Sequence, residues 1–180
     1  MNKTQKAIAI LLIIAAVVFV AGCSSQSSTQ KTTDNAGRPA EEHPDQSKEW
    51  MQKTSSDAEN ISSAANKLAT VLSNPEDLSQ ITALTTYIIT ESNKSRYDSA
   101  FYYHDDDLEP AVQKYADMMS SYGAFAKRID MSIEHLNAGN QVAAEVTIED
   151  AAESLTRGNK YYAEYKTMIE DFKKKHPEMA

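Results

Sequence analysis

The chain has 180 residues, a formal net charge of −8 at pH 7 and one cysteine, Cys23. So acidic a chain lacks the basic footprint of nucleic-acid-binding proteins. A single cysteine excludes a disulfide framework, a zinc site built from several thiolates and a Cys-x-x-Cys-His haem attachment. The folded part must therefore hold itself together by core packing, and about 130 residues suffice for one domain.

The N-terminal segment combines positive charge, an apolar run and small residues. Lys3 and Lys6 precede an apolar run over residues 7–21, and the chain turns polar directly after Cys23. This order is typical of an export signal. The ending Val20-Ala21-Gly22-Cys23 resembles the lipobox of prokaryotic lipoprotein signal peptides. The resemblance implies that residues 1–22 are removed and that Cys23 carries a lipid, which anchors the protein to a membrane on its extracytoplasmic side.

An uncleaved transmembrane anchor is the alternative interpretation of this segment. The apolar run is shorter than the roughly 20 residues that a helix needs to cross a bilayer core. A plain anchor also leaves the position of Cys23 unexplained. Both interpretations place the rest of the chain outside the cytoplasm. Removing Lys3 and Lys6 with the signal takes the net charge from −8 to −10, so anchoring must come from the lipid rather than from attraction to anionic membranes.

Residues 23–46 are predicted to be the lipidated cysteine and a flexible tether. They are rich in Ser, Thr, Gln and Asn and contain almost no large apolar side chain. Such a segment cannot bury enough surface to offset the entropy of ordering it.

The first predicted helix spans residues 47–73, and the second follows after a short break. Asn74 is a good N-cap and Pro75 suits the first helical position, so the second helix should run from Pro75 to about Tyr97. Residues at steps of three and four lie on one helix face. In the first helix these are Trp50, Thr54, Ala58, Ile61, Ala65, Leu68 and Leu72. In the second they are Leu78, Ile81, Thr85 and Ile88, followed by the small residues Ser92 and Ser95.

The third and fourth predicted helices carry the longest apolar faces. One of the aspartates at 105–107 should cap the third helix, with Pro110 in its first turn and Gly139 as its left-handed C-cap. The fourth should run from residue 140 or 141 to about Lys175. The third face comprises Leu108, Val112, Tyr115, Met119, Tyr122, Ala126, Ile129, Ile133 and Leu136. The fourth comprises Ala144, Ile148, Ala151, Leu155, Gly158, Tyr162, Tyr165, Ile169 and Phe172.

These elements predict an all-α domain over residues 47–180. Four helices with short connections favour an up-down-up-down antiparallel four-helix bundle, and an average step of 3.5 favours left-handed crossings near 20°. At 1.5 Å per residue the last two helices would be roughly 45 and 50 Å long, so the bundle should be elongated. The competing fold is an extended coiled-coil hairpin of the last two helices, with the first two packed loosely.

No motif indicates catalysis. No serine lies in a Gly-x-Ser-x-Gly turn, and the isolated glycines form no phosphate-binding loop. A triad assembled in space is the alternative. The densest group of metal-ligand types is His104, Asp105, Asp106 and Asp107. Its oxygens suit a hard cation, but its spacing lacks the pattern of an EF-hand loop. Helix capping accounts for the same aspartates without a metal. We expect no metal and no other cofactor.

Aromatic side chains gather at one predicted pole of the bundle, the pole nearest the tether. The residues that map there are Trp50, Tyr97, Tyr102, Tyr103, Tyr115, Tyr161, Tyr162, Tyr165 and Phe172, with Ser92 and Ser95 facing them. Small side chains opposite large ones indicate either an interlocked core or a pocket or partner surface.

Together these features predict a lipid-anchored extracytoplasmic helical bundle that serves as a non-catalytic binding or structural module at the cell envelope. Its expected partners are the membrane, through the lipid, and a protein of the envelope. A small-ligand sensor or carrier that uses the aromatic pole is the second interpretation. A metal-dependent enzyme is the least favoured.

Overall fold

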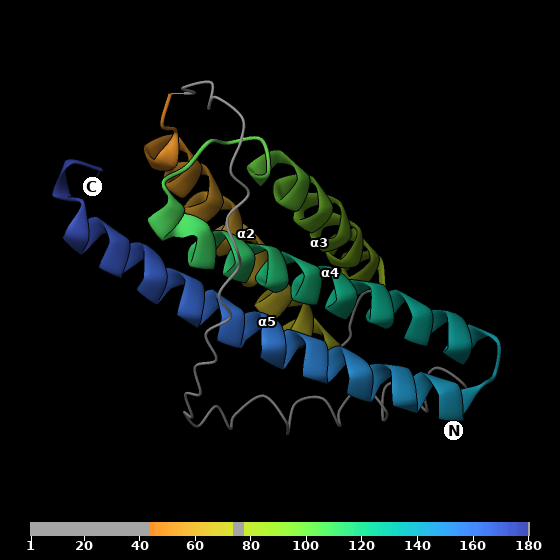
Figure 1. The fold of residues 1–180 in the computed structure, drawn as a ribbon. Helices are drawn as coiled ribbons and strands as arrows, with labels where there is room; N and C mark the ends of the chain where they lie inside the picture. The colour runs from red at the N-terminus through yellow and green to blue at the C-terminus, as the bar shows by residue number, and fades with distance from the viewer. Residues whose placement is uncertain (1–43, 74–77, 180) are drawn as a thin grey trace, which may run out of the picture.

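The structure, a computed structural model, describes residues 44–73 and 78–179. Four long helices lie side by side in this part of the chain (Figure 1). They are α2 (Ser47–Ser73), α3 (Leu78–Ser99), α4 (Glu109–Asn137) and α5 (Gln141–Lys175), with short 3-10 turns η2 (Asp106–Leu108) and η3 (Pro177–Met179). The predicted all-α, elongated up-down-up-down bundle is confirmed. The predicted signal peptide, Cys23, the tether up to residue 43, and the capping roles of Asn74 and Pro75 lie outside the described residues.

The helix bounds follow from local chemistry. Asn140 caps α5, because its side-chain oxygen accepts a hydrogen bond from the Ala143 N–H at 3.2 Å. Gly139 has φ 77°, the left-handed conformation predicted for the residue that ends α4. The prediction for the start of α4 was only half right. Asp105 caps the short turn η2 rather than α4 itself, accepting from the Asp107 N–H at 2.8 Å, while Pro110 lies in the first turn of α4.

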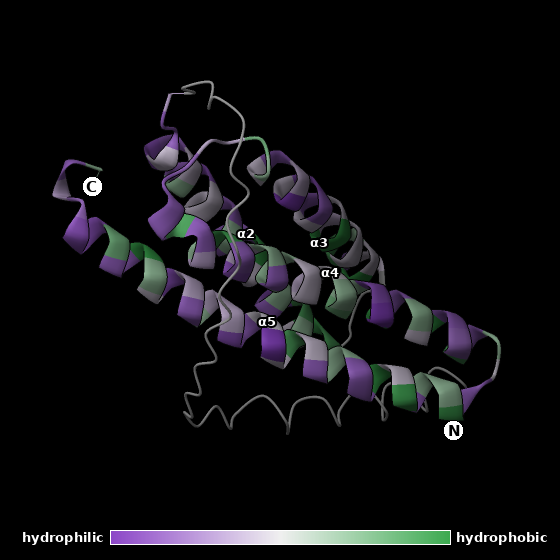
Figure 2. Ribbon diagram, in the orientation of Figure 1, coloured by the Kyte–Doolittle hydropathy of each residue, from purple (hydrophilic) through white to green (hydrophobic). Residues whose placement is uncertain are grey.

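The core lies along the inward faces of the four helices. Figure 2 shows apolar and polar residues alternating along each ribbon, as expected of amphipathic helices. All seven face positions predicted for α2 are buried. Ile81, Thr85 and Ile88 of α3 are buried as well, and the side chain of Leu78 is not among those described.

The third helix buries a wider face than the sequence predicted. Five further positions are buried beside the predicted ones: Ala111, Met118, Ser121, Phe125 and Ser132. Ala111, Met118, Phe125 and Ser132 form a second row at steps of seven, because α4 packs against α2, α3 and α5 at once. Val112, Ile133 and Leu136, predicted as core residues, are only partly buried, as is Tyr162 on α5. The competing hairpin fold is wrong, since α2 contacts all three other long helices.

Candidate functional site

The tether pole of the bundle is held by a group of backbone and side-chain hydrogen bonds. The Gln46 N–H donates to the Tyr103 carbonyl at 2.7 Å, and the Tyr103 N–H donates to Gln46 Oε1 at 3.2 Å. The Asp105 N–H donates to Ser47 Oγ at 2.8 Å, and that hydroxyl donates to Asp45 Oδ1 at 2.6 Å. The loop between α3 and α4 is therefore fixed directly beside the point at which the described chain begins.

Three of the predicted pole residues form a buried aromatic cluster, which we define as Trp50, Tyr115 and Tyr165. Their ring centroids lie 5.6–6.3 Å apart, at tilted or edge-on angles. All three are at most 1% exposed. Burial raises the pKa of the Tyr115 and Tyr165 phenols above its ordinary value. This part of the pole is a packed core, with His104 against the Trp50 ring at 5.9 Å.

Hydroxyl groups fix the orientation of the cluster. Thr54 Oγ1 donates to the Trp50 carbonyl at 2.7 Å, so the Tyr165 hydroxyl is the donor in its 2.7 Å hydrogen bond to Thr54. The Tyr115 hydroxyl interacts with Ser95 of α3. This interaction lowers the pKa of Tyr115, but the larger effect of burial raises it. Ser95 thus faces the cluster as predicted. Ser92 instead lies against Gly123 of α4, where a Cβ on the glycine would be 2.8 Å from Ser92 Oγ.

Other aromatic residues of the pole are exposed and form what we call the aromatic patch: Tyr97, Phe101 and Tyr103. They are 67%, 62% and 51% exposed. The Tyr97 and Phe101 rings meet edge to face at 4.8 Å. Tyr102, which lies between Phe101 and Tyr103 in sequence, is partly buried and packs against the core. The sequence reasoning followed tyrosines and missed Phe101, although Phe101 precedes Tyr102 and Tyr103 directly.

The remaining predicted residues lie on α5: Phe172 is buried, and Tyr161 and Tyr162 are partly buried. Lys114 lies over the Tyr161 ring at 4.5 Å, and Phe172 stacks on His176 at 4.2 Å. Tyr162 and Tyr165 border a depression of about 230 Å³ between α2 and α5, where Lys166 lies 5.5 Å from the centroid of the Tyr162 ring.

The candidate metal ligands are spread over separate contacts. His104 Nε2 lies 4.0 Å from Glu109, and Asp107 lies 3.7 Å from His176, which directly follows α5. Asp105 is occupied by capping. Within residues 44–73 and 78–179, no three His, Cys, Asp or Glu side chains are grouped so as to hold a metal ion. His104, Asp105, Asp106 and Asp107 are therefore not brought together as a ligand set.

Comparison with known proteins gives no relatives. No family model, curated protein or solved structure matches the chain. Of the helices in the described part, none is long and apolar enough to cross a membrane.

Proposed function

We propose that this chain is a lipid-anchored, extracytoplasmic helical-bundle protein that binds a protein partner at the cell envelope without catalysing a reaction. The anchoring half of the proposal rests on the Val20-Ala21-Gly22-Cys23 ending of the apolar run. The binding half rests on one observation: the aromatic patch is exposed beside the point at which the described chain begins.

Exposed aromatic groups are typical of contact surfaces, because they bury a large area at a low cost in side-chain entropy. The edge-to-face contact of Tyr97 with Phe101 at 4.8 Å restrains both rings before a partner arrives. The backbone of Tyr103 is held by Gln46. The aromatic patch is thus a restrained surface rather than three independent side chains.

The tether places this surface close to the membrane. If residues 24–44 behave as a flexible coil, their root-mean-square span is roughly 25 Å. The pole that carries the aromatic patch would then stay near the bilayer surface, where it could meet only membrane-bound or membrane-proximal proteins. We therefore propose a partner that is itself attached to the membrane.

The test is photo-crosslinking of the full-length protein in the membranes of its host. A benzophenone amino acid replaces Phe101 in one variant and Tyr87, a 41% exposed residue in the middle of α3, in the control. We expect a discrete protein adduct from position 101 and none from position 87. Tyr97→Ser in the position-101 variant should weaken the adduct. Equal adducts from both positions, or none from position 101, would contradict the proposal.

A second candidate function is a small-ligand carrier, favoured by the depression beside Tyr162 and Tyr165. Its lining combines the Tyr162 ring with Lys166 and Lys173 and with Glu59 and Glu170, which suits a ligand that has an apolar part and polar groups. In this case Tyr162→Ser should abolish binding of a hydrophobic fluorescent probe and leave the melting temperature nearly unchanged, because Tyr162 is only partly buried. Glu164→Gln on the same helix is the control. If the probe binds Tyr162→Ser as it binds the unaltered chain, this candidate is wrong.

A further inference from the structure

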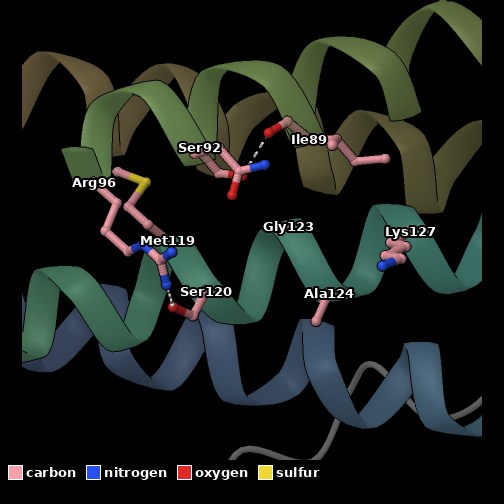
Figure 3. Close-up of a pocket in the computed structure, with 9 residues that line it drawn as sticks. Ile89, Ser92, Arg96, Met119, Ser120, Gly123, Ala124 and Lys127 are labelled. Atoms are coloured by element: carbon pink, nitrogen blue, oxygen red, sulfur yellow. Dashed lines mark hydrogen bonds between the residues drawn. The ribbon is translucent and has the colours of Figure 1, made fainter. Parts of the chain in front are cut away.

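A hollow between α3 and α4 shares no residue with the aromatic patch, although its lining residue Arg96 directly precedes Tyr97. It is independent of the function proposed above. It has a volume of about 240 Å³, and its position between the two helices is shown in Figure 3. Close approach of the helices creates it. Gly123 lets α4 come so near α3 that a Cβ there would be 2.8 Å from Ser92 Oγ. The small side chains of Ser120 and Ala124 then leave the space beside this contact unfilled.

Two cations stand at opposite ends of the hollow. Figure 3 shows Arg96 of α3 at one end and Lys127 of α4 at the other, with Ser120 and Ala124 between them. Both side chains are exposed. Neither pairs with a carboxylate of the described residues, whereas Lys53, Lys114, Arg128, Lys160 and Lys174 all do.

The polar lining offers mostly hydrogen-bond donors. Arg96 Nη1 donates to Ser120 Oγ at 3.1 Å, which holds the guanidinium over the hollow and leaves the serine proton available to a ligand. The amide of Asn93 adds two N–H groups. No carboxylate lines the hollow, although the whole chain carries a net charge of −8.

The rest of the lining is apolar, with Ile89 and Met119 on the inner side. At roughly 30 Å³ per water molecule the hollow holds the equivalent of about eight waters. It is smaller than the roughly 300–1,000 Å³ of pockets for drug-sized ligands. The occupant must therefore be small, with one anionic group and a short apolar part.

We infer that this hollow binds a small organic anion whose phosphate or carboxylate group is held by Arg96 and Ser120, in the positive field of Lys127. The guanidinium and the hydroxyl supply charge-assisted hydrogen bonds, and Lys127 adds a second positive charge from the opposite end. The apolar part of the ligand rests against Met119.

The test uses phenyl phosphate as the probe, with amide NMR shifts of the full chain recorded at constant ionic strength. Inorganic phosphate and phenol are the two comparison ligands. We expect saturable shifts confined to residues 89–96 and 119–127, with weaker binding of inorganic phosphate and none of phenol at equal concentration. Shifts that do not saturate, that spread over the whole surface, or that phenol reproduces would overturn the inference.

Variants separate the site from general charge. Arg96→Gln with Lys127→Gln should weaken phenyl phosphate binding by about tenfold or more, because charge-assisted hydrogen bonds are lost. The matched pair Lys94→Gln with Arg157→Gln changes the net charge equally on exposed residues outside the hollow and should leave the affinity nearly unchanged. Equal loss in both pairs would reduce the effect to bulk electrostatics. Ala124→Leu fills the hollow without altering charge, and unchanged binding by this variant would also count against the site.

Discussion

The ring of Tyr122 in α4 lies directly over Gly158 in α5: a Cβ on the glycine would stand 2.7 Å from Tyr122 Cε1. The missing side chain lets the ring cross between the helices. The Tyr122 hydroxyl then donates to Asn159 Oδ1 at 2.9 Å and lies 3.1 Å from Ser62 Oγ of α2. One tyrosine thus connects α2, α4 and α5 at the centre of the bundle.

Gly158→Ala should destabilise the bundle by about 1–3 kcal/mol, as overpacking does. Intrinsic helix propensity alone predicts the opposite sign, a gain of up to about 1 kcal/mol. Gly123→Ala is the matched control. Its Cβ would meet only the rotatable hydroxyl of Ser92, so its cost should be clearly smaller. Urea denaturation of both variants checks this, and equal stabilities would contradict the close contact with the Tyr122 ring.

Alkaline pH should destabilise the protein through its buried tyrosines. Burial raises the pKa of Tyr122 to about 12, against about 10 in an unfolded chain. The folded state therefore disfavours the ionised phenol, so this stability is complete below about pH 10 and is lost as the pH rises towards 12. Each such tyrosine contributes a slope of about 1.4 kcal/mol per pH unit.

The Tyr122→Phe variant isolates this effect. It should be less stable at pH 8 by about 1 kcal/mol, because its hydroxyl contacts are lost. Between pH 10 and 12 its stability should fall less steeply than that of the unaltered chain. Urea unfolding at several pH values gives both slopes, and parallel slopes would show that Tyr122 is accessible to ionisation when folded.

Periodicity was sufficient to predict the helices because each has an apolar face at regular spacing. All seven residues that it predicted for the face of α2 are buried, but it missed the buried Ser47, Met51 and Ser62 of the same helix. It could not give the second buried row of α4, which includes Met118 and Phe125, because that row depends on how many neighbours the helix has. Periodicity likewise placed Ser92 with the aromatic cluster, whereas the rotation of α3 turns it towards Gly123.

The site was harder to predict than the fold. Counting aromatic residues located the pole, but burial separates the aromatic cluster from the aromatic patch, and burial depends on tertiary packing. Trp50 is fully buried and Phe101 is 62% exposed. The hollow at Arg96 and Lys127 lies beside the contact between Gly123 and Ser92, two residues that meet only in the folded bundle. Mid-helix glycines at 123 and 158 were the available signal for such close approaches.

Two isoleucines of the predicted α4 face should differ in their tolerance of charge. Ile129 is fully buried, so Ile129→Asp should cost about 3 kcal/mol or more, because it buries an unpaired carboxylate. Sequence spacing alone predicts the same for Ile133→Asp. Ile133 is only partly buried, so we expect about 1 kcal/mol there. Denaturant midpoints of the two variants measure the difference, and equal costs would place Ile133 as deep as Ile129.

Cys23→Ser tests the anchoring half of the proposed function. If Cys23 is lipidated after cleavage, the serine variant should keep residues 1–22 and should not be labelled by a radioactive or alkyne-tagged fatty acid. The unaltered protein should take up the label and lose the signal. Mass spectrometry of the N-terminus distinguishes the two. An unaltered protein that retains Met1, or that begins at a residue other than Cys23, would contradict the lipoprotein interpretation.

Trp50 is the only tryptophan of the chain and is fully buried, so its fluorescence reports on the packing of the aromatic cluster. Acrylamide should quench it several times more slowly in the folded protein than in urea, because the Tyr115 and Tyr165 rings cover it. Tyr165→Ala should open a cavity beside the indole, raise the quenching rate and cost about 3 kcal/mol or more. Tyr165→Phe keeps the ring and loses only the hydrogen bond to Thr54, so it should quench like the unaltered protein. Quenching that is as fast in the folded protein as in urea would mean that the cluster is open to solvent and forms a pocket rather than a core.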